Sequence, residues 1–247
     1  MPIIGGGKMQ TRVNLLTNND CCKAAKPMKP TGIVVHSTGC DQKQIAAYTR
    51  AFNCPGVEKC VHGFLGLDEN GVLTYEQTLP YTVRCWGCGS GVRGSYNASH
   101  IQFEICETLN DRAWCRETFA AALDLCEKFC REYDISPENV VCHSEAHAKG
   151  YASNHADVMH WWPKHGLSMD GFRAELRKRL EDDDMAQRFK TINEVPASLR
   201  PETQALIDAG VLSGKGGNVG LDVTEDMLRT MIISKRYADQ VAKNGKR

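Results

Sequence analysis

The sequence lacks an excess of charge of either sign: its 247 residues include 30 Lys and Arg against 30 Asp and Glu. Because nucleic-acid binders normally carry a basic excess that displaces counterions from phosphates, this balance argues against a nucleic-acid partner. No hydrophobic run approaches the roughly 18 apolar residues of a membrane span, so we expect no membrane insertion. With 42% hydrophobic and 24% charged residues, the composition is that of a globular protein of one or two domains.

The beginning of the chain lacks the features of a signal peptide. Residues 1–7 contain neither a positively charged segment nor an apolar core. We therefore expect the protein to be made in the cytoplasm of its host without a signal peptide and to act outside only after something else releases it.

Cysteine is too scarce for a disulfide scaffold, because 12 residues are about 5% of the chain and such scaffolds have ~8–10%. We expect most thiols to be reduced and buried as small hydrophobic groups, as for Cys126 and Cys130. Cys85 and Cys88 have the spacing of a zinc knuckle or redox pair, but no second CxxC completes a four-thiolate site. All 12 Cys and all 8 His lie at or before His165, so the remaining tail differs in composition.

Short apolar patterns predict strands interspersed with helices. Strands are expected at residues 32–36, 62–66, 72–76, 100–106 and 139–143, and helices at residues 42–52, at 118–133 and after Ser168 as N-cap. Asn70-Gly71 predicts a hairpin between the second and third strands. The expected fold class is therefore α/β, with a central mixed β-sheet flanked by helices and a small α-helical C-terminal module.

An acidic run at residues 181–184 is interpreted as a solvated linker between two domains, residues 1–182 and 188–247. In the tail, residues 201–210 predict one helix, and Thr224 is the N-cap of a second. This tail resembles a single S-layer-homology-like helical unit. Two helices bury little alone, so we expect the module to bind the cell wall, to dock on the first domain, or to form a homodimer.

Two predicted strands end in histidine, at His36 and His143. Strand ends meet at one edge of a sheet, so these imidazoles can converge on a metal ion. The third ligand stays open on this reasoning, because the later segment offers several side chains: His147, His155, Asp157 and His160. Two imidazoles and a carboxylate suit Zn²⁺ and leave a fourth position for a water whose pKa falls to about 7.

Several separated motifs resemble the type 2 N-acetylmuramoyl-L-alanine amidases, a family of phage endolysins, wall-recycling amidases and peptidoglycan recognition proteins. The motifs follow the family order between residues 30 and 180: Ile33-Val34-Val35-His36-Ser37-Thr38-Gly39, Trp86-Gly87, residues 100–107, and Cys142-His143-Ser144-Glu145 through to Asp157-Val158-Met159-His160-Trp161-Trp162. The strongest likeness is to amidases of Firmicutes and their phages that carry a Ser-Asn-His-x-Asp-x-x-His-Trp stretch, here residues 153–161.

The resemblance implies a zinc site formed by His36, His143 and Asp157. It also implies that His155, at a position where the family often has Lys, donates a hydrogen bond to a developing oxyanion; the alternative is that His155 only packs. Glu104 matches the catalytic carboxylate that accepts and returns a proton.

Other candidates for these roles are weaker. Some phage members use a Tyr at the position of Val61, and its absence favours Glu104. Glu107 is expected to face away, and Glu145 is the second candidate for the carboxylate. Trp86, in a Gly-rich loop, is expected either to contact substrate or to close the core.

The implied reaction is zinc-dependent hydrolysis of the amide between N-acetylmuramic acid and L-alanine in peptidoglycan, and we expect the protein to be a phage or prophage endolysin. The expected partners are the glycan strand and the stem peptide. The alternatives are a wall-recycling amidase, a non-catalytic peptidoglycan-binding protein, and a thiol-based redox or zinc-scaffold protein that would use Cys85, Cys88 and the vicinal pair Cys21 and Cys22.

Overall fold

A six-stranded sheet organises the first part of the chain, in the order β1-β4-β3-β5-β2-β6. The strands are β1 (Gln10–Val13), β2 (Gly32–Ser37), β3 (Gly63–Leu67), β4 (Leu73–Gln77), β5 (His100–Ile105) and β6 (Val140–Cys142). β3 and β4 pair antiparallel, as the Asn-Gly turn predicted, and the other neighbouring strands pair parallel. The predicted mixed sheet is confirmed.

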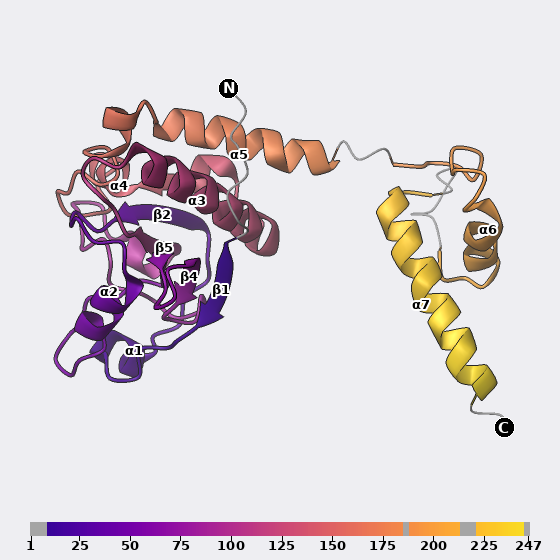
Figure 1. Ribbon diagram of the computed structural model, residues 1–247, viewed down its shortest axis with the longest axis horizontal. Coiled ribbons are helices and arrows are strands. Elements are labelled where there is room, and N and C mark those ends of the chain that lie inside the picture. Colours follow the sequence, from indigo (N-terminus) through magenta and orange to yellow (C-terminus); the bar gives the residue numbers. More distant parts are fainter. Residues whose placement is uncertain (1–8, 185–187, 213–220, 245–247) are drawn as a thin grey trace. The chain divides into compact units, whose positions relative to one another are not determined.

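The structure is a computed structural model that describes residues 9–184, 188–212 and 221–244. It divides into two compact units, residues 1–180 and 181–247 (Figure 1). The helices of the first unit are α1 (Asp20–Ala24), α2 (Ile45–Phe52), α3 (Arg112–Tyr133), α4 (His143–Ala148) and α5 (Met169–Asp184), and short 3-10 turns lie at Tyr96–Ala98, Pro137–Asn139 and Trp162–His165. No described helix has the length and apolar character needed to cross a membrane.

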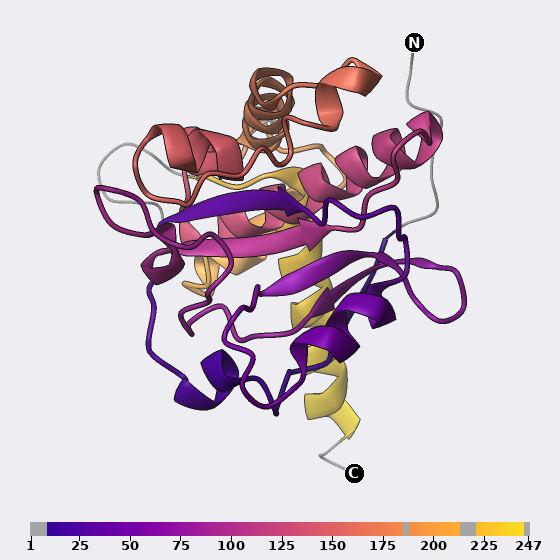
Figure 2. The ribbon, with the colours of Figure 1, turned by 90° about the vertical axis from the view of Figure 1, so that its left-hand side faces the viewer.

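Helices cover both faces of the sheet (Figure 2). On one face, Ile33 and Phe103 belong to a core that also contains Phe119 of α3 and Phe172 of α5. On the other face, Phe64 packs with Ile45 of α2. Every residue of β2 is buried, because this strand lies between β5 and β6 in the interior of the sheet.

Helix α3 begins six residues before the predicted start at Thr118. The reason is a cap that the apolar pattern does not show: the Asp111 carboxylate accepts a hydrogen bond from the Trp114 backbone N–H, at 3.0 Å. The predicted apolar stripe is correct, because its members Phe119, Ala122, Leu123, Cys126, Phe129 and Cys130 are all buried.

Two local predictions are wrong in detail. His143 does not end a strand but begins α4, since the Glu145 carboxylate accepts a hydrogen bond from the Cys142 backbone N–H, at 3.2 Å, and closes the first turn. The acidic run at residues 181–184 is not a linker but the last turn of α5, because Glu and Asp do not by themselves interrupt a helix. The strand β1 and the helix α1 have no counterpart in the predictions.

The second unit contains α6 (Arg200–Asp208) and α7 (Glu225–Asn244). Its small core consists of five buried side chains: Phe189, Val195, Leu221, Val223 and Leu228. Thr224 caps α7 as predicted, and its hydroxyl accepts from the Met227 N–H at 3.3 Å. Residues 213–220, between α6 and α7, lie outside the described residues.

An aromatic cluster supports the loop that follows α4. Trp162 packs against Phe119 and Phe172, with ring centroids 4.9 and 5.4 Å apart. Trp161 and Trp162 are 1% and 0% exposed, so they pack inside the unit and do not face a ligand. This cluster anchors the chain at Trp162, five residues after Asp157.

Replacing Phe172 with Ala tests this packing. The side chain is fully buried, so truncation should leave a cavity and lower the free energy of unfolding of the first unit by about 3–5 kcal/mol. Tryptophan fluorescence during urea unfolding measures it, since all four Trp lie in this unit. The control Val92→Ala, at a 98% exposed side chain, should change it by less than about 0.5 kcal/mol. A loss for Phe172→Ala as small as that of the control would contradict the packing.

Candidate metal centre

The centre lies where two adjacent parallel strands end. His36 is near the end of β2, and His143 directly follows β6, which pairs with β2 through Val35 and Cys142. The third member, Asp157, comes from the loop after α4. Its backbone carbonyl accepts a hydrogen bond from the Ser144 N–H at 3.1 Å, which ties this loop to the first turn of α4.

The three predicted ligands come together. His36 Nδ1 lies 2.9 Å from Asp157 Oδ2 and 3.1 Å from His143 Nδ1, and His143 Nδ1 lies 3.5 Å from Asp157 Oδ1. Among the described residues these form the one group of three or more His, Cys, Asp or Glu with ligand atoms all within 4.8 Å of one another. All three are buried.

The outer nitrogen of each ring determines which nitrogen faces the centre. His36 Nε2–H donates to Gln102 Oε1 at 3.1 Å, and His143 Nε2–H donates to the Ser153 backbone carbonyl at 3.0 Å. Each neutral ring therefore carries its lone pair on Nδ1. Two lone pairs 3.1 Å apart repel each other unless a cation lies between them, so the residues present fit a bound metal ion.

Backbone groups fix the orientation of Gln102. Its Nε2–H donates to Asn97 Oδ1 at 3.1 Å, and the same oxygen accepts from the backbone N–H groups of Gly87 and Cys88 at 3.0 and 3.1 Å. Because backbone N–H groups can only donate, Asn97 must present its oxygen, and Gln102 must turn its own oxygen toward His36. This network connects His36 to the loop that follows Trp86.

The protonation behaviour of the centre also favours a cation. Burial alone would raise the pKa of Asp157, but the imidazoles of His143 and His36, when they are also protonated on the Nδ1 atoms that face this carboxylate, hold its pKa well below the usual range. Burial alone would lower the pKa of His36, and the Asp157 carboxylate raises it above its ordinary value instead. The centre thus stabilises positive charge between the two rings and the carboxylate.

Glu104 lies beside the centre. It is the register partner of His36 on β5, and it shares a sheet face with that residue. Burial raises the pKa of Glu104 to about 7. Its Oε2 atom is buried and has no hydrogen-bond partner in the described part of the chain. A carboxyl group in this state is suited to accept and return a proton near neutral pH.

The other two predicted site residues, His155 and Trp86, are both exposed. His155 is exposed and its ring stacks on that of His143, with centroids 4.7 Å apart. Trp86 is 38% exposed and has the Arg84 guanidinium over its ring, which argues against the alternative that it closes the core.

Glu145, the second candidate for the catalytic carboxylate, and Glu107 are both paired with other side chains. Glu145 makes two hydrogen bonds of 2.9 Å with Arg173. Glu107 pairs with His160 at 3.0 Å. Sequence reasoning missed Gln102 and Asn97. The strand alternation could have indicated Gln102, since it lies on the same face as Glu104 two residues earlier, whereas nothing in the local pattern indicates Asn97.

Comparison with known proteins supports the family resemblance of the sequence motifs. The family model described as N-acetylmuramoyl-L-alanine amidase matches residues 26–160, and the chain belongs to this family of amidases. The family and the enzymatic activity that the motifs predicted are thereby confirmed. A search of curated proteins finds no match.

Two solved structures illustrate the shared fold. A mutant endolysin from Bacillus subtilis has 24% sequence identity and a TM-score of 0.53, and the match covers 68% of this chain and 99% of that chain. The hydrolase AmiA of Staphylococcus aureus, solved in complex with its ligand, has 19% identity and a TM-score of 0.56, covering 73% of this chain and 87% of that chain.

Replacing Gln102 with Leu tests the role of the outer hydrogen bond. The variant removes the acceptor that holds His36 in its metal-binding tautomer, so we expect zinc affinity to fall about 10–100-fold. Competition with a chromophoric chelator measures the affinity. Gln77→Leu on β4 is the matched control and should leave it unchanged. Equal zinc affinity of the Gln102→Leu variant and the unmodified chain would contradict the assigned role.

Proposed function

We propose that this amidase is a zinc enzyme that hydrolyses the bond between N-acetylmuramic acid and L-alanine in peptidoglycan, in the manner of a phage or prophage endolysin. The observation that carries the proposal is the convergence of His36 Nδ1, His143 Nδ1 and an Asp157 oxygen in a member of the amidase family. Nitrogen and carboxylate ligands in a three-residue set are typical of catalytic zinc, which keeps a position for water.

In the proposed mechanism, His36, His143 and Asp157 would hold a zinc ion, which would supply positive charge to polarise the amide carbonyl and to lower the pKa of a water. Gln102 and the Ser153 carbonyl hold the two imidazoles in the required tautomer. The Glu104 carboxylate accepts the proton of the attacking water and returns it to the leaving amine of L-alanine, a contribution of ~10²–10⁴-fold.

We assign oxyanion stabilisation to His155. Its exposed ring lies against His143 and therefore next to the metal ligands, where a ring N–H can donate to the carbonyl oxygen of the substrate as that oxygen gains negative charge. A His at this position can donate either as the neutral ring or as the cation. Trp86 is assigned to contact the glycan or the stem peptide, because much of its indole is exposed.

Two observations favour an endolysin over the alternatives. The three ligands and Glu104 are all present and assembled, which argues against a non-catalytic wall-binding protein. The B. subtilis endolysin shares the fold of the catalytic unit, and the added second unit favours a lysin over a recycling enzyme.

We propose that this second unit contacts the wall, the catalytic unit or a second copy of the chain. Its α7 exposes Ile233, Tyr237 and Val241. Synthesis in the host cytoplasm and later release to the wall complete the proposal.

Digestion of purified cell walls tests the function. The zinc-loaded chain should release new N-terminal L-alanine amines, a chelator should abolish this release, and added zinc should restore it.

The Asp157→Ala variant should lose both zinc and activity. Glu104→Gln should keep zinc and lose about 10²–10⁴-fold in kcat. Because only the carboxylate form accepts a proton, the activity of the unmodified chain should fall as the pH drops through the pKa of Glu104, and the residual activity of the variant should lack this decline.

Glu138→Gln is the matched control for Glu104→Gln, because Glu138 is exposed, pairs with Arg177 at 2.8 Å and is not part of the metal centre, so we expect its loss to leave kcat within about threefold. Wall digestion that releases reducing sugars and no L-alanine amines would contradict the proposed bond specificity. Full activity in Glu104→Gln would remove the proton-transfer role.

A further inference from the structure

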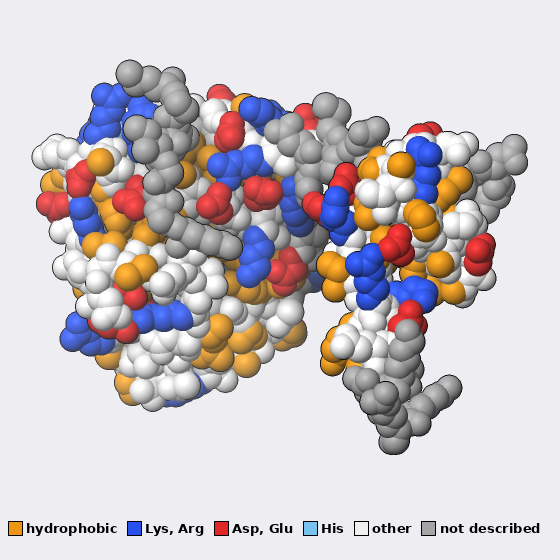
Figure 3. Space-filling view, turned by 45° about the vertical axis from the view of Figure 1, so that its right-hand side comes forward, with side chains coloured by type: hydrophobic (Ala, Val, Ile, Leu, Met, Phe, Trp, Pro, Cys, Tyr) orange, Lys and Arg blue, Asp and Glu red, His pale blue; other side chains and the backbone are white. Residues whose placement is uncertain are grey.

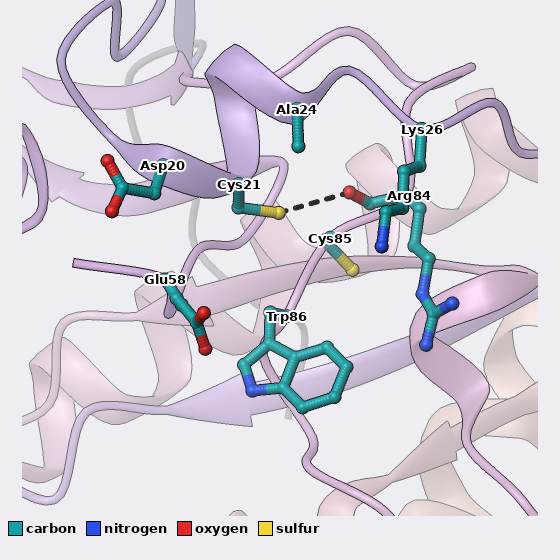
Figure 4. A pocket seen from close by; sticks show the side chains of 8 residues that line it. All are labelled: Asp20, Cys21, Ala24, Lys26, Glu58, Arg84, Cys85 and Trp86. Carbon is teal, nitrogen blue, oxygen red and sulfur yellow. Dashed lines mark hydrogen bonds between the residues drawn. The ribbon is translucent and has the colours of Figure 1, made fainter. Parts of the chain in front are cut away.

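A cavity of about 260 Å³ lies beside Trp86 and contains thiols that the amidase reaction does not use. Figure 4 shows the side chains that line it, which come from α1 and the residues just after it, from the segment before β3 and from the segment after β4. They are Asp20, Cys21, Ala24, Lys26, Glu58, Arg84, Cys85 and Trp86. The Cys21 thiol donates to the Arg84 backbone carbonyl at 3.2 Å.

Behind this cavity, cysteines distant in sequence gather in one cluster. Cys60, from the segment before β3, and the vicinal pair Cys21 and Cys22 of α1 lie in one side-chain cluster. Cys60 and Cys85 are 0% exposed and pack with Leu79, against which Cys21 and Cys22 also pack. All four thiols are free. The buried Cys60 is thus placed against two partners on one short helix.

The thiols of Cys21 and Cys60 differ in reactivity. The hydrogen bond from Cys60 and the positive charges of Arg84 and Lys26 lower the pKa of Cys21, although burial and Glu58 act in the opposite direction. Hydrogen bonds with Cys21 and Cys22, together with burial, raise the pKa of Cys60 far above its ordinary value. Cys21 is also partly exposed and lines the cavity. It is therefore the nucleophilic thiol, and Cys60 is the buried partner.

The CxxC pair identified in the sequence does not form this site. Cys88 accepts a hydrogen bond from Gln102 Nε2 at 3.4 Å and donates to Asn97 Oδ1 at 3.2 Å, so its sulfur belongs to the network behind the metal centre. Cys85 alone contributes to the cluster at the cavity.

We propose that Cys21, Cys22 and Cys60 form an oxidant-sensitive site in which a peroxide closes a disulfide between Cys60 and one of the vicinal pair on α1. This inference goes beyond the amidase function and does not depend on it. The disulfide would connect α1 to the residue whose backbone pairs with Trp86, through hydrogen bonds of 3.2 and 3.0 Å. Oxidation would therefore anchor the segment that carries Trp86.

The chemistry needs one equivalent of hydrogen peroxide. The Cys21 sulfur attacks a peroxide oxygen, an S–O bond forms as the O–O bond breaks, and the leaving hydroxide takes up a proton to become water. The Cys60 sulfur then attacks the Cys21 sulfur, an S–S bond replaces the S–O bond, and the hydroxyl leaves as a second water with the Cys60 proton. Two thiols are oxidised to one disulfide, and the peroxide is reduced to two waters.

Peptide mapping of the full chain tests the proposal. The zinc-loaded, reduced protein is treated with equimolar hydrogen peroxide, its remaining thiols are alkylated, and its disulfide-linked peptides are identified by mass spectrometry. We expect loss of most alkylatable thiol at Cys60 and a peptide that joins it to the segment of Cys21 and Cys22. The new link closes a loop of about 40 residues, so the Tm of the first unit should rise by several degrees and return after reduction.

The exposed thiols Cys40 and Cys54 are internal controls, because exposure alone would make them react first. The double variant Cys21→Ser with Cys22→Ser should lose the crosslink and the Tm shift while it retains full amidase activity under reducing conditions. Its matched control, Cys40→Ser with Cys54→Ser, should keep both the crosslink and the Tm shift. Oxidation confined to Cys40 and Cys54, a disulfide between Cys85 and Cys88, or persistence of the Tm shift in the first double variant would overturn the proposal.

Discussion

Nδ1 of His36 and Nδ1 of His143 face each other at 3.1 Å. This close contact determines what the centre can bind, and the other features of the centre follow from it. The outer N–H groups of the two rings are committed to the oxygens of Gln102 and Ser153, so neither ring can relieve the contact by moving its proton inward without losing a buried hydrogen bond. A cation between the rings and the Asp157 carboxylate removes the conflict. The centre is therefore arranged for a metal ion before any ion binds.

The fold supplies this arrangement through rigid elements. His36 is held in a fully buried strand, and His143 begins a helix whose first turn is closed by Glu145 and Arg173. The loop that carries Asp157 is tied to that helix by a backbone hydrogen bond and is anchored from behind by the Trp162 aromatic cluster. Ligands placed in this way lose little conformational freedom on binding, which favours a well-defined coordination geometry.

Much of this architecture could be predicted because it depends on local pattern. A short β-branched run indicated the strand that carries His36, apolar alternation indicated the strand that carries Glu104, and the Asn-Gly dipeptide indicated the hairpin. Local pattern could not choose Asp157 from the neighbouring histidines, because the choice depends on a loop whose path is set by tertiary packing; the family resemblance supplied it. The network through Gln102 and Asn97 was missed for the same reason, since it joins a strand to a Gly-rich loop without periodicity. The contact of α1 with Cys60 joins residues about 40 positions apart, which no local signal reports.

A crystal structure of the zinc-loaded chain, with anomalous diffraction recorded at the zinc absorption edge, tests the central claim most directly. We expect one strong peak at about 2.0–2.2 Å from Nδ1 of His36, Nδ1 of His143 and a carboxylate oxygen of Asp157. A peak bound through the Nε2 atoms, or zinc held by the thiols of Cys21, Cys22 and Cys60 with none between the two histidines, would contradict it.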